Sequence, residues 1–199
     1  MKLNKYFFSF LILVLSLKSH SSYSMAPDVF VQSTVNRASE ILSSDIPKEI
    51  KIEKLKLIAE ETVDINGIGF YTLGSYRKTL NDEQKKRYKD LFKNYFLKSF
   101  SSRLAEYTNP EIQVKNKKVL NENYTMVYSV LVATSDRPEV QINWRVYTKN
   151  PDNPLIRDLI IEGLSLARTQ KEEFASILNS NDNDINVLFK TLEKFSNNN

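Results

Sequence analysis

Apolar residues recur every three or four positions through the first half of the chain. This spacing marks a segment from Val31 to Leu42, which Pro47 closes, and a second from Ile52 to Ala59. Because such a period gathers apolar side chains along one face of a helix, both segments are predicted to be amphipathic helices. Residues 66–79 hold three of the four glycines among apolar and aromatic residues, and we expect short helical turns there.

The longest predicted helix begins after Asn81. Asn81 and Gln84 have the spacing of a capping box, in which each side chain binds the backbone N–H of the other residue. Charged residues cover one face of the helix, from Lys85 to Asp90. The other face carries an apolar and aromatic stripe in steps of three and four: Tyr88, Leu91, Phe92, Tyr95, Phe96, Phe100, Leu104 and Tyr107.

The period changes from 3.6 to 2 after Pro110. Four extended segments follow, beginning at Ile112 and covering 124–134, 140–147 and 155–161. Short turns between consecutive strands favour an antiparallel meander. Two helices are predicted to end the chain, over 170–179 and 184–195, with Thr169 and Glu172 as a candidate cap for the first. The predicted class is α+β: helices packed on one face of a curved four-stranded antiparallel sheet.

Residues 1–24 are typical of a secretory signal peptide. Lys2 and Lys5 precede a short apolar run, and Ser22 and Ser24 place small side chains before a cut at Met25. The run is too short to span a bilayer, which takes about 20 apolar residues in a helix. We therefore expect cleavage, a periplasmic location, and a single mature domain over residues 25–199.

Charge and residue usage narrow the function. Removing the three lysines of the leader from the 28 basic residues leaves 25 against 24 acidic residues, so the net charge falls from +4 to +1 and no basic field for nucleic acid remains. The only histidine, His20, lies in the leader, and the chain has no cysteine. Ser-His-Asp and Cys-His catalysis and the usual zinc, copper or iron sites are excluded, and we expect no cofactor.

Asp158 and Glu162 are the carboxylates most open to a catalytic interpretation. Both fall in the last predicted strand on the same side, where four residues at about 3.3 Å each separate them by roughly 13 Å. The carboxylate pairs of glycosidases lie within about 10 Å of each other. We expect a structural role instead, in ion pairs with Arg145, Arg157 or Arg168, or in solvent.

The glycines of residues 66–79 and the scattered tyrosines suggest two further functions, nucleotide binding and an isomerase-like activity. Gly67 and Gly69 fit only part of a dinucleotide-binding loop, and no predicted strand precedes them, so close backbone approach or tight turns explain them better. Scattered tyrosines beside acids would suit an isomerase-like enzyme on a curved sheet, acting on a small apolar substrate: Tyr76, Tyr88, Tyr95, Tyr107 and Tyr128. The apolar residues of helix and sheet fit either an ordinary core or a dry cavity, and periodicity does not separate the two.

Two blocks of sequence resemble a known family. They are "VDINGIGFYTLGSYR" with the helix after it, over residues 63–108, and "IRDLIIEGLSLARTQKEEFASIL" over 156–178. They are similar to the toluene-tolerance family, the MlaC-type periplasmic phospholipid-binding proteins, in the same order and over nearly the whole mature chain. Departures are small: Gly69 stands where alanine is commoner, and Lys171 stands near the usual arginine.

The resemblance implies a soluble, non-enzymatic phospholipid carrier that shuttles lipid between the outer membrane and an inner-membrane ABC transporter, maintaining outer-membrane lipid asymmetry. It implies phospholipid as cargo, and as partners a transporter complex with an MCE-domain subunit and an outer-membrane lipoprotein–porin complex; we expect a monomer. On this interpretation Asp158 and Glu162 fix the turn at the pocket rim by ion pairing. The expected pocket lining, with inward positions taken from periodicity, is Phe70, Leu73, Tyr76, Phe92, Phe96, Phe100, Val130, Ile142, Trp144, Leu159, Ile161, Leu164 and Leu166.

Overall fold

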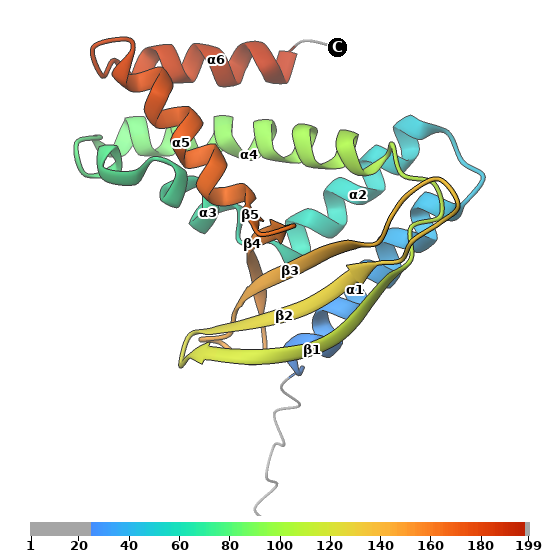
Figure 1. The fold of residues 1–199 in the computed structure, drawn as a ribbon. Coiled ribbons are helices and arrows are strands. Elements are labelled where there is room, and N and C mark those ends of the chain that lie inside the picture. The colour runs from blue at the N-terminus through green and yellow to red at the C-terminus, as the bar shows by residue number, and fades with distance from the viewer. Residues whose placement is uncertain (1–24, 198–199) are drawn as a thin grey trace, which may run out of the picture.

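A computed structural model describes residues 25–197 (Figure 1). The predicted signal peptide lies outside the described residues. The helices are α1 (Pro27–Ser43), α2 (Lys48–Thr62), α3 (Ile65–Thr72), the 3₁₀ turn η1 (Gly74–Lys78), α4 (Asp82–Leu104), α5 (Leu166–Asn179) and α6 (Ile185–Asn197). The strands are β1 (Ile112–Asn121), β2 (Tyr124–Leu131), β3 (Val140–Tyr147), β4 (Leu155–Ile161) and β5 (Leu164–Ser165).

The sheet is an antiparallel meander in the order β1-β2-β3-β4-β5. This confirms the α+β class and the four predicted strands, and corrects their number to five. The extra strand has two residues and pairs Ile161 with Leu164 across a tight turn. Glu162 (φ 49°) and Gly163 (φ 83°) make that turn in the left-handed region. A two-residue strand carries no alternation from which a sequence pattern could predict it.

Local sequence signals predicted the N-terminus of one helix and failed at another. Asn81 caps α4 as predicted: its side chain accepts from the Gln84 N–H at 2.8 Å, and its own N–H donates to the Gln84 side chain at 3.1 Å. The predicted cap of α5 is wrong. That helix begins at Leu166, and the Ser165 Oγ accepts from the Arg168 N–H at 3.1 Å.

The helices lie on one face of the curved sheet, and α6 packs on α4 and α5 on the side away from the strands (Figure 1). Helix α1 packs against β1 and β2, and α5 packs against β4. Helix α4 runs through the layer and packs against α2, α3 and α6. The buried core draws on every layer, with Val31, Tyr88, Val127, Val146 and Leu188 all fully buried. No helix within residues 25–197 is long and apolar enough to cross a membrane.

Candidate functional site

A cavity of about 360 Å³ lies between the helix layer and the sheet. Its walls come from α1, α2, α4, α5, β3 and β4, with single residues from α3, β1 and β2 and four residues from three connecting segments. The volume falls in the range of about 300–1,000 Å³ that pockets for small apolar ligands occupy. The structure therefore decides between the two interpretations that periodicity left open: helix and sheet do not close completely on each other.

Eight of the thirteen residues predicted to line a pocket lie in the wall of this cavity: Phe92, Phe96, Phe100, Ile142, Trp144, Leu159, Ile161 and Leu166. The three phenylalanines repeat at four-residue steps on α4, which places them on one face. The Phe96 and Phe100 rings stack with their centroids 5.5 Å apart. Contact between these eight side chains and a lipid stays a prediction.

Three of the other five lie in or beside the core away from the cavity. Leu73, at the end of α3, is 2% exposed in the main core, and Phe70 packs against the same core from the side. The Tyr76 hydroxyl donates to the Asn179 side chain at 2.8 Å and to that of Asn183. This region forms α3 and η1 and packs mainly against α5 and α4, so that only Ile68 among residues 66–79 lines the cavity.

Val130 and Leu164 are corrected by strand geometry. Side chains alternate between the two faces of a strand, and in β2 the inward set includes Val127 and Leu131. Val130 therefore lies on the outer face, where it borders a shallow hollow beside Lys115. Leu164 lies on the short strand β5 and is 58% exposed.

Sequence reasoning missed the wall formed by α1 and α2. Nine residues of these helices line the cavity: Thr34, Val35, Ala38, Ser39, Leu42, Leu55, Ile58, Ala59 and Thr62. Several belong to the apolar stripes that predicted the two helices. The stripe shows which face of a helix is apolar, but it does not show whether that face meets a solid core or a cavity.

Three polar side chains in the wall, those of Thr34, Thr62 and Trp144, are engaged by neighbouring residues. The hydroxyl of Thr34 donates to the Phe30 carbonyl at 2.9 Å, and that of Thr62 to the Ile58 carbonyl at 2.7 Å. The Trp144 indole donates to the Ser129 Oγ at 2.8 Å. Because these groups already have partners, the surface that they offer to the cavity is largely apolar.

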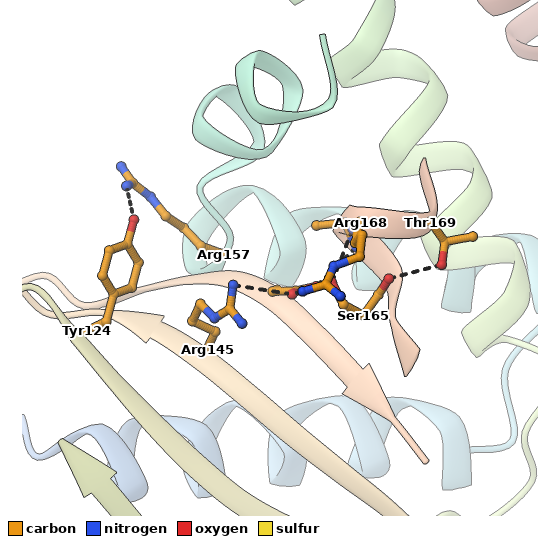
Figure 2. A network of polar contacts seen from close by, with 8 residues as sticks. Tyr124, Arg145, Arg157, Ser165, Arg168 and Thr169 are labelled. Carbon is orange, nitrogen blue, oxygen red and sulfur yellow. Dashed lines mark hydrogen bonds and ion pairs between the residues drawn. The ribbon is translucent and has the colours of Figure 1, made fainter. Parts of the chain in front are cut away.

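Asp158 supports the start of α5. Its carboxylate is almost fully buried, accepts from the Ser165 hydroxyl at 2.6 Å and the Ala167 N–H at 3.0 Å, and lies 3.8 Å from the Arg145 guanidinium. Figure 2 shows Ser165 and Arg145 converging on this point, with the Thr169 hydroxyl donating to the Ser165 carbonyl. The predicted structural role of Asp158 is confirmed.

Glu162 fixes the β4–β5 turn in another way than predicted. Within the described part of the chain it forms no ion pair. Its carboxylate accepts from the Gln141 N–H, and its own N–H donates to the Gln141 carbonyl at 3.0 Å. The side chain of this left-handed residue is exposed and reaches back to the neighbouring strand, so backbone hydrogen bonds replace the expected ion pair.

Arg157 joins β4 to the start of α3. The register shifts after the Arg145–Asp158 pair, which makes Arg157 the extra residue of a bulge. Its guanidinium donates to Asp64 at 2.7 Å. It also donates to the Tyr124 hydroxyl at 2.6 Å (Figure 2). Asp64 also caps α3 by accepting from the Gly67 N–H at 2.8 Å. A Cβ on Gly67 would collide with that carboxylate, which confirms close approach as the reason for this glycine.

Four lining residues are exposed and mark where the cavity reaches solvent: Arg103, Tyr107, Leu166 and Glu173. We call this opening the mouth. Within residues 25–197 no cluster of histidine, cysteine, aspartate or glutamate side chains is placed to hold a metal ion.

The sequence model of the family described as MlaC protein matches residues 32–194. The chain belongs to the MlaC family. The resemblance found in the two sequence blocks is thereby confirmed. A comparison with curated protein sequences gave no match.

A solved structure has the same fold as this MlaC-family chain. It is a phospholipid-binding protein from Ralstonia solanacearum in complex with a phospholipid. The two superpose with a TM-score of 0.70 at 20% identity, over 85% of this chain and 96% of that chain. At this identity the likeness establishes the shared fold.

Proposed function

We propose that this protein is a phospholipid carrier that encloses acyl chains in the cavity between its helices and its sheet. The observation that carries the proposal is the cavity itself, a largely apolar space in whose wall the polar groups of Thr34, Thr62 and Trp144 have partners, with a mouth at the surface. Membership of the MlaC family and the phospholipid bound to the R. solanacearum protein support the same role. The eight predicted lining residues would contact the chains.

The energy of exposed acyl chains explains why a carrier needs such a space. Two chains hold about thirty CH₂ groups, and each contributes about 0.8 kcal/mol to burial. Leaving them in water costs on the order of 20 kcal/mol, so a lipid leaves a membrane readily only when an equally dry site receives it. Transfer between membrane and cavity is then close to isoenergetic and needs no catalytic residue.

On this proposal the mature chain, residues 25–199, is a single carrier domain that works as a monomer in the periplasm after its leader is removed. It exchanges lipid with an outer-membrane lipoprotein–porin complex and with an inner-membrane ABC transporter that has an MCE-domain subunit. Direction would come from ATP hydrolysis at the transporter. Lipid is the cargo, and the role requires no cofactor and no nucleic acid.

The contacts of Asp158 and Tyr95, an acid and a tyrosine in the cavity wall, favour the carrier over the isomerase-like enzyme. The Asp158 carboxylate is occupied by Ser165, Ala167 and Arg145. The Tyr95 hydroxyl donates to the Gln170 side chain at 2.6 Å, and burial raises its pKa. A general base or acid must reach the proton that it moves, whereas both of these groups support the fold.

Filling the cavity tests the proposal. Ser99 on α4 lines the cavity and Ser102 on the same helix does not, and both are half-buried. We expect Ser99→Trp to fold and to extract far less labelled phospholipid from liposomes than wild type, and Ser102→Trp to extract the wild-type amount. Equal extraction by both variants would contradict a lipid site in this cavity.

A further inference from the structure

Two arginines line the cavity at the end that lies beside the C-terminus of α4. Arg103 lies in the last turn of α4 and is exposed, and Arg137 lies in the β2–β3 loop and is half-buried; both line the cavity. Tyr107 lies one turn after Arg103, just beyond the end of α4. The guanidinium carbon of Arg137 lies 5.8 Å from the centroid of the Tyr107 ring. Helix end and loop thus bring two positive charges to one side of the mouth.

Neither guanidinium is neutralised by the protein. Within residues 25–197, no carboxylate pairs with Arg103 or Arg137. Arg137 donates from Nη2 to the Val132 carbonyl at 3.1 Å, which positions the side chain. Its Nε is sealed from solvent and has no hydrogen-bond partner among the described residues. Buried donors are nearly always satisfied, so an unpaired N–H in the cavity wall is consistent with a ligand as its partner.

We propose that Arg103 and Arg137 bind the phosphodiester of the lipid headgroup at the mouth. The inference rests on the proposed function and assigns the polar half of the same ligand. Guanidinium groups match phosphate oxygens in paired hydrogen bonds better than a point charge does. A phosphodiester joined to two acyl chains places its charge next to its apolar part, as the arginines lie next to the apolar cavity.

Glu173 decides which side of the mouth takes the phosphate. Its exposed carboxylate lies on α5, where the Gln170 side chain donates to it at 2.8 Å. A phosphate near that carboxylate would be repelled, whereas Arg103 and Arg137 on the α4 side would attract it. The site therefore selects lipids that carry a phosphate over neutral lipids with the same chains.

The only tryptophan of the sequence, Trp144, lines the cavity and reports its occupancy. Lipid-free protein is titrated with dioleoylphosphatidylglycerol whose chains are brominated, and separately with the matching brominated diacylglycerol, which lacks the phosphate. Quenching of Trp144 gives the apparent Kd of each. The variants are Arg103→Gln, the double variant R103Q/R137Q, and the control Arg77→Gln on η1. Arg77 is exposed and lies before the other end of α4.

We expect the double variant to weaken phosphatidylglycerol binding by about tenfold or more and Arg103→Gln by several-fold, because each arginine makes charge-assisted hydrogen bonds. Diacylglycerol binding should stay unchanged in every variant, and Arg77→Gln should bind both lipids as wild type does. Equal loss of both lipids, or loss of neither, would overturn the headgroup assignment while leaving the carrier in place.

Two further outcomes distinguish binding of free phosphate from binding of a lipid headgroup, and failure of this inference from failure of the proposed function. If inorganic phosphate alone raises the melting temperature of wild type but not of the double variant, and phospholipid affinity is the same in both, the arginines bind free phosphate and the assignment is overturned. If neither lipid quenches Trp144 in wild type, the proposed function itself fails, and this inference fails with it. Because Arg103 is exposed, Arg103→Gln keeps the test valid if the double variant does not fold.

Discussion

The indole N–H of Trp144 donates to the Ser129 hydroxyl at 2.8 Å, and this hydroxyl donates to the Ile142 carbonyl at 2.7 Å. We call these two consecutive hydrogen bonds the relay. Trp144 and Ser129 are both buried. This relay satisfies the one polar atom of the Trp144 ring inside the sheet, so that the ring can line the cavity without an unpaired donor.

Ser129→Ala removes the acceptor of that relay and leaves the Trp144 N–H buried without a partner. We expect the free energy of unfolding to fall by about 1–3 kcal/mol, measured by urea denaturation. Trp144→Phe in the same background removes the stranded donor as well. Because the two residues interact directly, their effects should be non-additive; strict additivity would contradict the relay.

Gly69 gives Phe92 the room to line the cavity. A Cβ on Gly69 would lie 2.7 Å from Cδ1 of the Phe92 ring, which is itself 2% exposed. Gly69→Ala should therefore destabilise the protein by about 1–3 kcal/mol and push the ring toward the cavity, reducing lipid uptake. Thermal unfolding and liposome extraction measure the two effects. Phe92→Leu added to Gly69→Ala should recover part of the stability, and a fully stable single variant would rule out this close contact.

The two carboxylates of the β4–β5 region should differ in what they contribute. Asp158 is buried and accepts two hydrogen bonds, so Asp158→Asn should cost about 1.5–3 kcal/mol of unfolding free energy. Glu162 is exposed, and Glu162→Gln retains an acceptor for the Gln141 N–H, so its cost should stay within about 0.5 kcal/mol. Chemical denaturation compares them, and equal costs would contradict the support that Asp158 gives to α5.

Tyr88 should make the protein sensitive to high pH. Burial holds the pKa of this fully buried phenol well above its ordinary value of about 10. Below about pH 10 the phenol is neutral in both the folded and the unfolded chain, and its contribution to the free energy of unfolding is complete. Above about pH 10 the phenol ionises only in the unfolded chain, so the free energy of unfolding falls by up to about 1.4 kcal/mol per pH unit. The loss ends once the pH passes the folded pKa.

Tyr88→Phe tests this dependence. Thr72 keeps its own acceptor, the Gly69 carbonyl, at 2.7 Å, so the variant should fold. Urea midpoints measured at several pH values above about 9 should fall less steeply for the variant than for wild type. Parallel slopes would show that Tyr88 does not couple folding to pH.

Local signals predicted most of the fold. The capping box of Asn81 and Gln84 fixed the start of α4, and the alternation of β3 fixed its inward face, with Ile142 and Trp144 in the cavity wall. The start of α5 escaped prediction because its cap depends on Asp158, a residue from the preceding strand that orients Ser165. A long-range contact of this kind has no sequence spacing by which it could be recognised.

The cavity was harder to place than the fold. Phe92, Phe96 and Phe100 were predicted correctly as part of its wall because a helical repeat fixes their common face. Val130 was misplaced because β2 is apolar on both faces, with Met126 and Val127 both buried, and alternation then gives no direction. The wall from α1 and α2 depends on how the helices sit over the sheet, which only the tertiary structure shows.

The most direct measurement of the central claim is native mass spectrometry of the protein purified from periplasm without detergent, followed by extraction and identification of the bound lipid. The carrier account predicts a mass that exceeds the polypeptide by one phospholipid, lost on organic extraction. A lipid-free mass, together with no uptake of phospholipid from liposomes, would contradict it.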